Sequence, residues 1–128
     1  MSKHFKISEF LCVHKDGTTC GFDAVDPRLL KGLELLRDII RKPIIINSGC
    51  RCKKHNAEVG GEPNSQHLLG KAADIRIVGI LPQRIFQAAA LVPEFQQGGI
   101  GIYDTWLHVD VRTDGRPHRW DKRKRKHA

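Results

Sequence analysis

The chain has 128 residues, a formal net charge of +8, 40% hydrophobic residues and 28% charged residues. This length suffices for one hydrophobic core and leaves little room for a second, so we expect a single domain. No apolar run approaches the roughly 20 residues of a membrane-spanning helix, which argues against a membrane span. The positive charge indicates a polyanionic partner.

The first long element that the sequence predicts is a helix beginning at Asp26-Pro27. Residues 5–22 mix polar and turn residues, so we expect them to wrap the domain without a regular element. Asp26 can cap the helix with its carboxylate, and Pro27 suits the first helical position. Apolar residues then recur at helical spacing until Lys42-Pro43 ends the helix, and this stripe predicts core packing. The stripe consists of Leu29, Leu30, Leu33, Leu36, Ile39 and Ile40.

Shorter elements follow the helix. Ile44–Asn47 predicts a buried strand that delivers Ser48-Gly49-Cys50-Arg51 at its end. Residues 52–59 predict a short helix, and the Gly- and Pro-containing residues 60–64 predict a loop.

The second half of the chain alternates strands and one helix. Ala72–Ile77 predicts a strand, and Pro82–Leu91 predicts a second amphipathic helix. Residues 98–103 and 105–112 predict two strands that pair as a hairpin around Asp104. Because helices precede and interrupt the strands without regular alternation, we expect an α+β fold with a small, mostly antiparallel sheet.

The most informative pattern consists of His67, Asp74 and His108. Two imidazoles and one carboxylate can hold Zn²⁺ and leave a fourth position for water, whereas a closed structural site normally uses four protein ligands. Such an open site indicates hydrolysis. We expect one ligand from a loop, one from a strand edge and one from a second strand. The alternative is a turn-capping His67, an ion-paired Asp74 and an ordinary strand histidine at 108.

The residues around this cluster resemble one family. Ser48–Arg51, Ser65–His67, Ala72–Asp74 and His108–Asp110 resemble the small zinc peptidases of the D-alanyl-D-alanine carboxypeptidase type. These enzymes cut peptidoglycan and are related in fold to hedgehog signalling domains and D-Ala-D-Ala dipeptidases. The resemblance runs from about Phe5 to Trp120. It implies one zinc peptidase domain over residues 1–120, with a single catalytic Zn²⁺ held by the three ligands and a basic, disordered tail over residues 121–128.

The resemblance leaves the general base open. In much of the wider family an acidic residue lies three positions before the last ligand histidine, and here that position is Thr105. If the strand is regular, Asp104 and Asp110 share the face of His108, and we favour Asp110 as the catalytic base. Alternatively, Asp110 orients a ligand imidazole through its other nitrogen, and Asp104 is an ordinary turn residue.

The resemblance also points to residues that bind substrate. Arg51 matches the family's arginine after Ser-Gly-x, which contacts a substrate oxygen. Its planar guanidinium suits a terminal carboxylate or a developing oxyanion, so we expect both a substrate-binding and a catalytic role. The alternative is a structural salt bridge. Ser65 and Gln66 precede the first ligand and could hydrogen-bond peptide groups of the substrate.

The four cysteines do not form the usual zinc-finger pattern of paired Cys-x2-Cys knuckles. Their positions are Cys12, Cys20, Cys50 and Cys52. Free thiols, a disulfide between Cys12 and Cys20, and a second structural zinc all stay open.

These observations favour a zinc metallopeptidase acting on peptidoglycan peptides, as a D,D-carboxypeptidase or an endopeptidase. Because an acid is missing at position 105, the alternative is a non-catalytic, zinc-containing domain that binds the cell wall. We expect the protein to act as a monomer.

The basic C-terminal run and the start of the chain bear on partners and location. Residues 119–127 contain six Lys or Arg residues and one Asp. This run could be a solvated terminus, or it could bind anionic cell-wall polymers. Nucleic-acid binding is the third alternative, and the lack of a helix or strand that would place the run in a groove disfavours it. The first residues lack the apolar stretch of a secretory signal, so we expect a protein that is cytoplasmic until it is released, or one that acts at the cell wall, and phage-type release is one hypothesis for its route.

Overall fold

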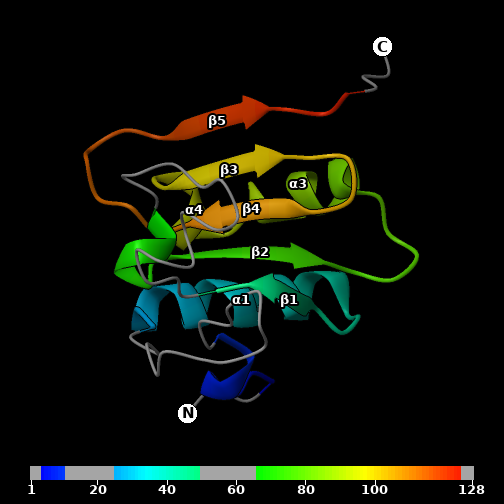
Figure 1. The fold of residues 1–128 in the computed structure, drawn as a ribbon, viewed down its shortest axis with the longest axis horizontal. Coiled ribbons are helices and arrows are strands. Elements are labelled where there is room, and N and C mark those ends of the chain that lie inside the picture. Colours follow the sequence, from blue (N-terminus) through cyan, green and yellow to red (C-terminus); the bar gives the residue numbers. More distant parts are fainter. Residues whose placement is uncertain (1–3, 11–24, 50–65, 125–128) are drawn as a thin grey trace, which may run out of the picture.

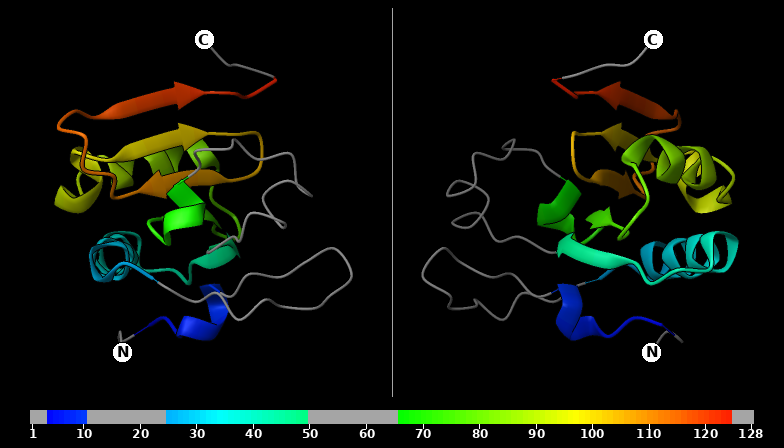
Figure 2. Two further views of the ribbon diagram at one scale, coloured as in Figure 1. Left: turned by 60° about the vertical axis from the view of Figure 1, so that its left-hand side comes forward. Right: turned by 90° about the vertical axis from the view of Figure 1, so that its right-hand side faces the viewer.

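The computed structural model describes residues 4–10, 25–49 and 66–124. Within these ranges one sheet has the strand order β1-β2-β4-β3-β5, and helices cover one of its faces (Figures 1 and 2). All neighbouring strands run antiparallel except β3 and β5, which are parallel. This arrangement confirms the α+β fold with a mostly antiparallel sheet. The elements are η1 (Ile7–Phe10), α1 (Pro27–Ile40), β1 (Ile45–Ser48), η2 (Gln66–Leu69), β2 (Ala72–Arg76), α3 (Pro82–Ala89), α4 (Pro93–Gln96), β3 (Gly99–Ile102), β4 (Leu107–Asp110) and β5 (His118–Asp121).

Helix α1 begins where the sequence predicts. The Asp26 carboxylate accepts a hydrogen bond from the Arg28 backbone N–H at 2.9 Å, and Pro27 occupies the first turn. The helix ends at Ile40, and Arg41 follows in the left-handed conformation with φ 62°, its N–H donating to the Arg37 carbonyl. This left-handed residue reverses the chain before Pro43, which cannot extend a helix.

The core lies between the helices and the covered face of the sheet. Within α1, Leu29, Leu33 and Leu36 are buried as predicted, and Leu30 and Ile40 pack against the core. Ile39 is the exception, because 45% of it is exposed. The prediction that it belongs to the packing stripe was wrong.

The N-terminal segment takes a different form from the one we expected. Residues Ile7–Phe10 form a 3-10 helix, although the sequence predicted no regular element there. Phe5 and Phe10 are both buried, and their ring centroids lie 6.3 Å apart. The burial of these two rings adds this short segment to the core and stabilises the local helix.

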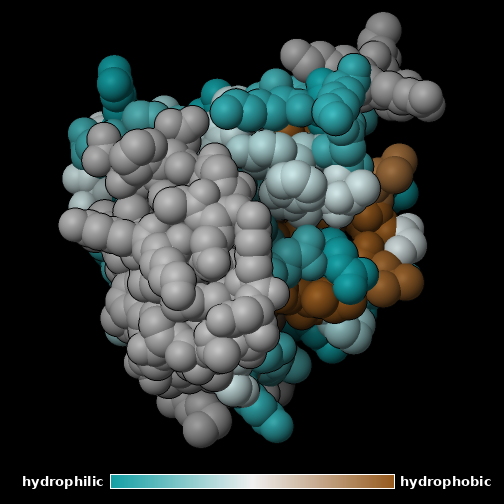
Figure 3. Space-filling model, in the orientation of Figure 1, coloured by the Kyte–Doolittle hydropathy of each residue, from teal (hydrophilic) through white to brown (hydrophobic). Residues whose placement is uncertain are grey.

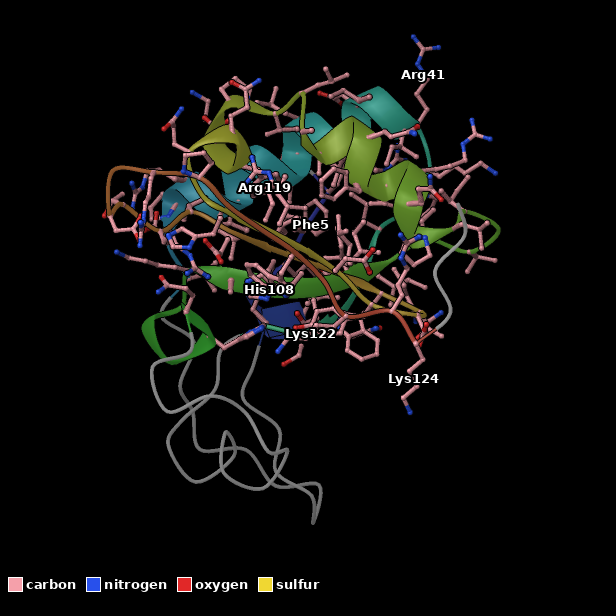
Figure 4. The ribbon with its side chains drawn as sticks, turned by 90° about the horizontal axis from the view of Figure 1, so that it is seen from above. Phe5, Arg41, His108, Arg119, Lys122 and Lys124 are labelled. Atoms are coloured by element: carbon pink, nitrogen blue, oxygen red, sulfur yellow. The ribbon has the colours of Figure 1, made fainter. Side chains whose placement is uncertain are left out.

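Helix α3 and the hairpin of β3 and β4 confirm the corresponding predictions. The hairpin closes with the Tyr103 N–H donating to the Trp106 carbonyl at 3.0 Å. In β4 the side chains alternate, so that Leu107 and Val109 enter the core while His108 and Asp110 lie on the other face. Figure 4 shows His108 on the side of the sheet away from the helices.

Strand β5 was not predicted, and it moves the expected boundary of the domain. The strand includes Asp121, the Lys122 N–H donates to the Ile102 carbonyl at 2.8 Å, and the Lys124 N–H donates to Asp104. The tail that we expected to begin at residue 121 is therefore joined to the domain as far as Lys124. Residues 125–128 lie outside the described ranges.

The sequence of β5 lacks the alternation of apolar and polar residues that predicts a strand. Arg119 takes the position that faces the helices. Its guanidinium donates to the carbonyl oxygens of Phe95, Gln96 and Gly98. Figure 4 shows Arg119 on this side of the sheet. A charged side chain thus fills a place where an alternating pattern would show an apolar one.

The connection between β2 and α3 carries apolar side chains outside the core. Val78 is 71% exposed and Leu81 is 70% exposed. Apolar colour gathers on this part of the surface in Figure 3. Among the described helices, none is both long enough and apolar enough to cross a membrane.

Candidate metal centre

Three different elements bring His67, Asp74 and His108 together. His67 lies in η2, Asp74 in β2 and His108 in β4, and the antiparallel register sets Asp74 directly opposite His108. Each residue offers one ligand atom, and these three atoms lie within 4.8 Å of one another. In the described part of the chain, no other His, Cys, Asp or Glu residues form such a group. The first ligand comes from a 3-10 helix, where we had expected a loop.

The His67 imidazole is fixed by a backbone carbonyl. Its Nδ1 lies 2.6 Å from the Gly49 oxygen, so Nδ1 carries the proton and donates it. The ring is only 1% exposed, and its Nε2 lies 3.3 Å from Asp74 Oδ1. A Cβ at Gly49 would meet the Phe10 Cα at 2.8 Å. This close approach explains why glycine follows Ser48 in the motif.

The His108 imidazole is fixed by a carboxylate. Its Nε2 lies 2.7 Å from Asp110 Oδ2, and its Nδ1 lies 3.2 Å from Asp74 Oδ1. With Nε2 donating to Asp110, the lone pair of Nδ1 faces the cluster. Both imidazoles therefore have one nitrogen held outside the cluster and the other directed at Asp74, which is the usual arrangement of a metal-binding histidine.

The donor set fits a zinc ion in its chemistry, and the two distances from Asp74 fit in their spacing. Zinc binds imidazole nitrogen and carboxylate oxygen, and two ligand atoms at about 2.0–2.1 Å from a tetrahedral ion are roughly 3.4 Å apart. The distances from Asp74 Oδ1 to His67 Nε2 and His108 Nδ1 are 3.3 Å and 3.2 Å. These three side chains therefore form a possible metal-binding triad.

The charges of the cluster favour an ionised Asp74. Burial alone would raise the pKa of this carboxyl, but the hydrogen bonds and charges of His108 and His67 outweigh burial and lower the pKa below its ordinary value. Burial would likewise lower the pKa of His108, yet Asp110 and Asp74 raise it. Asp74 thus supplies negative charge for a cation, and acidification disfavours metal binding by protonating His108.

The Asp110 carboxylate has contacts on both oxygens. Oδ1 accepts hydrogen bonds from the backbone N–H groups of Gly99 and Arg112, and Oδ2 lies 2.7 Å from both His108 Nε2 and Arg112 Nη2. The side chain is fully buried. This geometry favours the alternative that the sequence left open for Asp110, in which it orients the His108 ring.

Asp104 does not lie in the strand that carries His108. Strand β4 begins at Leu107, and Asp104 sits in the hairpin turn, where its Oδ1 accepts the Lys124 N–H at 3.0 Å. The parity argument required an extended chain from residue 104 onward, and that requirement is not met. The geometry therefore favours the turn role for Asp104.

The remaining predicted site residues are only partly within the described ranges. Arg51 and Ser65, together with the expected helix 52–59, the loop 60–64 and all four cysteines, lie outside them. Gln66 opens η2, and its carbonyl accepts the Lys71 N–H at 3.1 Å. Its role toward a substrate stays a prediction.

Two residues near the cluster were missed by the sequence analysis. Arg112 pairs with Asp110, and the Trp120 ring centroid lies 5.0 Å from that of His108. The spacing Asp-x-Arg at Asp110 was visible in the sequence, but the approach of Trp120 depends on the parallel pairing of β5 with β3.

Comparisons with known proteins agree with this geometry. The model of one protein family, described as Peptidase M15, matches residues 3–110. A search among curated proteins found no match. The matched segment includes all three residues of the possible metal-binding triad and ends at Asp110. Peptidases of this family depend on zinc, which agrees with the donor set.

The first prediction concerns metal content. We expect the purified protein to carry about one zinc ion per chain at this site. His67→Ala or His108→Ala should remove this zinc and leave the far-ultraviolet circular dichroism unchanged, because the apolar core lies on the other face of the sheet. Full metal content in both variants would refute the ligand assignment. A further zinc that persists in both variants would point to the cysteines.

The second prediction separates the two roles of Asp110. If Asp110 orients His108, Asp110→Asn should weaken zinc affinity by about 10–100-fold. If it is the general base, the same variant should retain zinc and lose about 10²–10⁴-fold in turnover. Asp104→Asn is the matched control, and we expect it to change neither quantity. Loss of turnover in Asp104→Asn with zinc retained would make Asp104 the base.

Proposed function

Because this chain belongs to the Peptidase M15 family, we propose that it is a zinc metallopeptidase that hydrolyses peptide bonds of peptidoglycan. The observation that carries the proposal is the convergence of His67, Asp74 and His108 with donor atoms at zinc-like spacing. Among the described residues the cluster has three protein ligands, in place of the four of a structural site, and this number suits a catalytic centre.

The residues of the cluster have distinct parts in the proposed reaction. When bound, zinc supplies a Lewis acid that polarises a carbonyl oxygen and activates water at neutral pH. The Gly49 carbonyl and the Asp110 carboxylate keep His67 and His108 in the tautomers that direct a lone pair to the metal. The Asp74 carboxylate offsets part of the charge of the cation. A proton acceptor is also needed, and the Asn variants described above test Asp110 and Asp104 for this role.

The proposed substrate is a peptide of the cell wall. In this proposal Arg51 binds a terminal carboxylate or the developing oxyanion, and Ser65 and Gln66 hydrogen-bond the peptide chain. The cut releases a terminal D-alanine in a carboxypeptidase or divides a cross-link in an endopeptidase. Both reactions hydrolyse a peptide bond of the same polymer.

The basic C-terminal residues fit an anionic cell-wall polymer as a second contact. Arg123 pairs with Asp121, while Lys124 is exposed and no ion pair of its side chain is seen among the described residues. We propose wall polymers over nucleic acid because the described part of the basic run, up to Lys124, belongs to an edge strand and the residues after it, and it offers no helix for a groove. A monomer released from the cytoplasm by phage-type lysis fits this partner.

A second candidate function is a wall-binding domain that keeps zinc without turnover. Thr105 stands where the wider family has an acid, and the Asp110 carboxylate is already engaged by His108 and Arg112. Both observations count against a general base at position 105 or at Asp110.

The third prediction decides between these two functions. Purified peptidoglycan incubated with the zinc-loaded protein should release D-alanine or cleaved peptides, measured by chromatography and mass spectrometry. A chelator should abolish the release, and added zinc should restore it. His108→Ala is the control for a contaminating enzyme. Wall binding without any zinc-dependent product would favour the binding domain.

The fourth prediction concerns the basic residues at the C-terminus. The triple variant Lys124→Gln, Arg125→Gln and Lys126→Gln should bind anionic wall less well at low salt and cleave a small soluble peptide as fast as the wild type. Screening over a Debye length of about 8 Å at physiological ionic strength should reduce the difference in binding. Equal loss of binding and peptide cleavage would mean that these side chains support the domain itself.

A further inference from the structure

The chain that follows Asp110 lies beyond the segment matched by the family model, yet it packs against the metal cluster. The match ends at residue 110, whereas Arg112 and Trp120 contact Asp110 and His108. We propose that Arg112 and Trp120 are positioning residues that hold the His108 imidazole in its metal-binding orientation, Arg112 through Asp110 and Trp120 by direct ring contact. This inference rests on the metal centre of the proposed function and does not depend on which bond is cut.

Arg112 holds the Asp110 carboxylate with a fork of two hydrogen bonds. Its Nη2 lies 2.7 Å from Oδ2, and its Nε lies 2.9 Å from Oδ1. The Gly99 N–H approaches Oδ1 at 2.8 Å from the neighbouring strand. A bidentate guanidinium fixes the plane of a carboxylate as well as its position. The direction of Oδ2 toward His108 Nε2 is therefore set by Arg112.

The backbone of β3 leaves room for this carboxylate. A Cβ at Gly99 would lie 2.3 Å from Asp110 Oδ2, so any larger residue would displace the carboxylate. The neighbouring Gly101 leaves room in the same way for Trp120, whose ring would lie 2.2 Å from a Cβ there. Both glycines lie on the face of the sheet that carries His108.

Trp120 is the second residue that restrains the His108 ring. Its ring meets the His108 ring at an interplanar angle of 46°, and the Arg112 guanidinium carbon lies 5.6 Å from the Trp120 ring centroid. The indole N–H donates to the Tyr103 hydroxyl at 3.1 Å. The indole is thus fixed at its edge and touches both the imidazole and the guanidinium.

The energetic consequence follows from the sensitivity of metal sites to ligand orientation. The ligand side chains of a functional site must be held within about 0.5 Å and 10–20° of the geometry that binds the metal. The His108 ring turns about the bond from its strand, and Asp110 and Trp120 restrain that rotation at Nε2 and at the ring face. Without Arg112, the buried Asp110 loses a charged partner and the restraint on Nε2 loosens.

The chain itself offers a matched control for Arg112. Asp121 and Arg123 repeat the same Asp-x-Arg geometry, with Nη2–Oδ2 and Nε–Oδ1 distances of 2.7 Å and 3.0 Å. Arg123→Gln removes the same charge and the same kind of fork at the other end of the sheet, where Asp121 pairs with Ile102 and Asp110 lies beside Gly99. Asp110 also holds His108 and is fully buried, whereas the Asp121 side chain is 31% exposed, so the thermal unfolding of both variants is measured beside their zinc affinity.

The test compares Arg112→Gln with Arg123→Gln by zinc affinity, measured in competition with a chromogenic chelator. We expect Arg112→Gln to weaken zinc binding by about 10–100-fold, the usual effect of losing an outer partner of a metal ligand. Arg112→Lys should restore part of the affinity, because it returns the charge without the fork. Arg123→Gln should bind zinc as the wild type does.

A spectroscopic readout separates positioning from general stability. In the cobalt-substituted protein, Arg112→Gln should change the visible absorption bands, and Arg123→Gln should not. Trp120→Ala should change them as well, whereas Trp120→Phe should retain most of the wild-type spectrum because it keeps a ring against His108. Thermal unfolding of the metal-free variants reports any loss of stability independently.

The proposal is overturned if Arg112→Gln and Trp120→Ala bind zinc and absorb as the wild type does. It is also overturned if Arg123→Gln weakens zinc binding as much as Arg112→Gln. If Arg112→Gln does not fold, Arg112→Lys carries the same test, and unchanged affinity and spectrum in that variant would refute the role of the fork. A wild type that binds zinc but cleaves no wall peptide would refute the proposed function and leave this inference standing.

Discussion

The antiparallel register of β2 and β4 is the constraint on which the site depends. It pairs Asp74 with His108 and Ala72 with Asp110, so that both carboxylates and the imidazole project from one face of the sheet. A shift of β4 by one residue would turn His108 and Asp110 into the core. The apolar side chains of the same strands, including Ile75 and Val109, prevent that shift because their burial stabilises the present register.

On the face of the sheet that carries His108, glycines leave the space that neighbouring side chains need. Gly99 and Gly101 leave the space that the Asp110 carboxylate and the Trp120 indole occupy. Gly49 approaches Phe10 closely and presents its carbonyl to His67. Gly49 lies in a motif that resembles the peptidase family, and each of the three glycines has a steric reason for being there.

The sequence predicted α1, the hairpin and the ligand cluster because each has a local or family signal. Asp26-Pro27 marks a helix start within a few residues, and alternation in Leu107–Asp110 marks the two faces of β4. The sequence did not predict β5, because Arg119 replaces an apolar side chain by donating to three carbonyl oxygens contributed by distant residues. It placed Asp104 in the hairpin turn but left open whether Asp104 shares the face of His108, because strand parity says nothing of where the strand begins.

The sequence by itself determined the class of fold, the three candidate ligands and the family, since these depend on periodicity and on residue types at fixed spacing. Only the tertiary structure decided which nitrogen of each histidine faces Asp74, because that choice depends on the Gly49 carbonyl, 18 residues from His67, and on how the Asp110 carboxylate is held beside His108. It likewise decided that Arg112 contacts Asp110 and that the Trp120 ring contacts His108. A parallel edge strand brings Trp120 there, and no short-range pattern encodes such a long-range pairing.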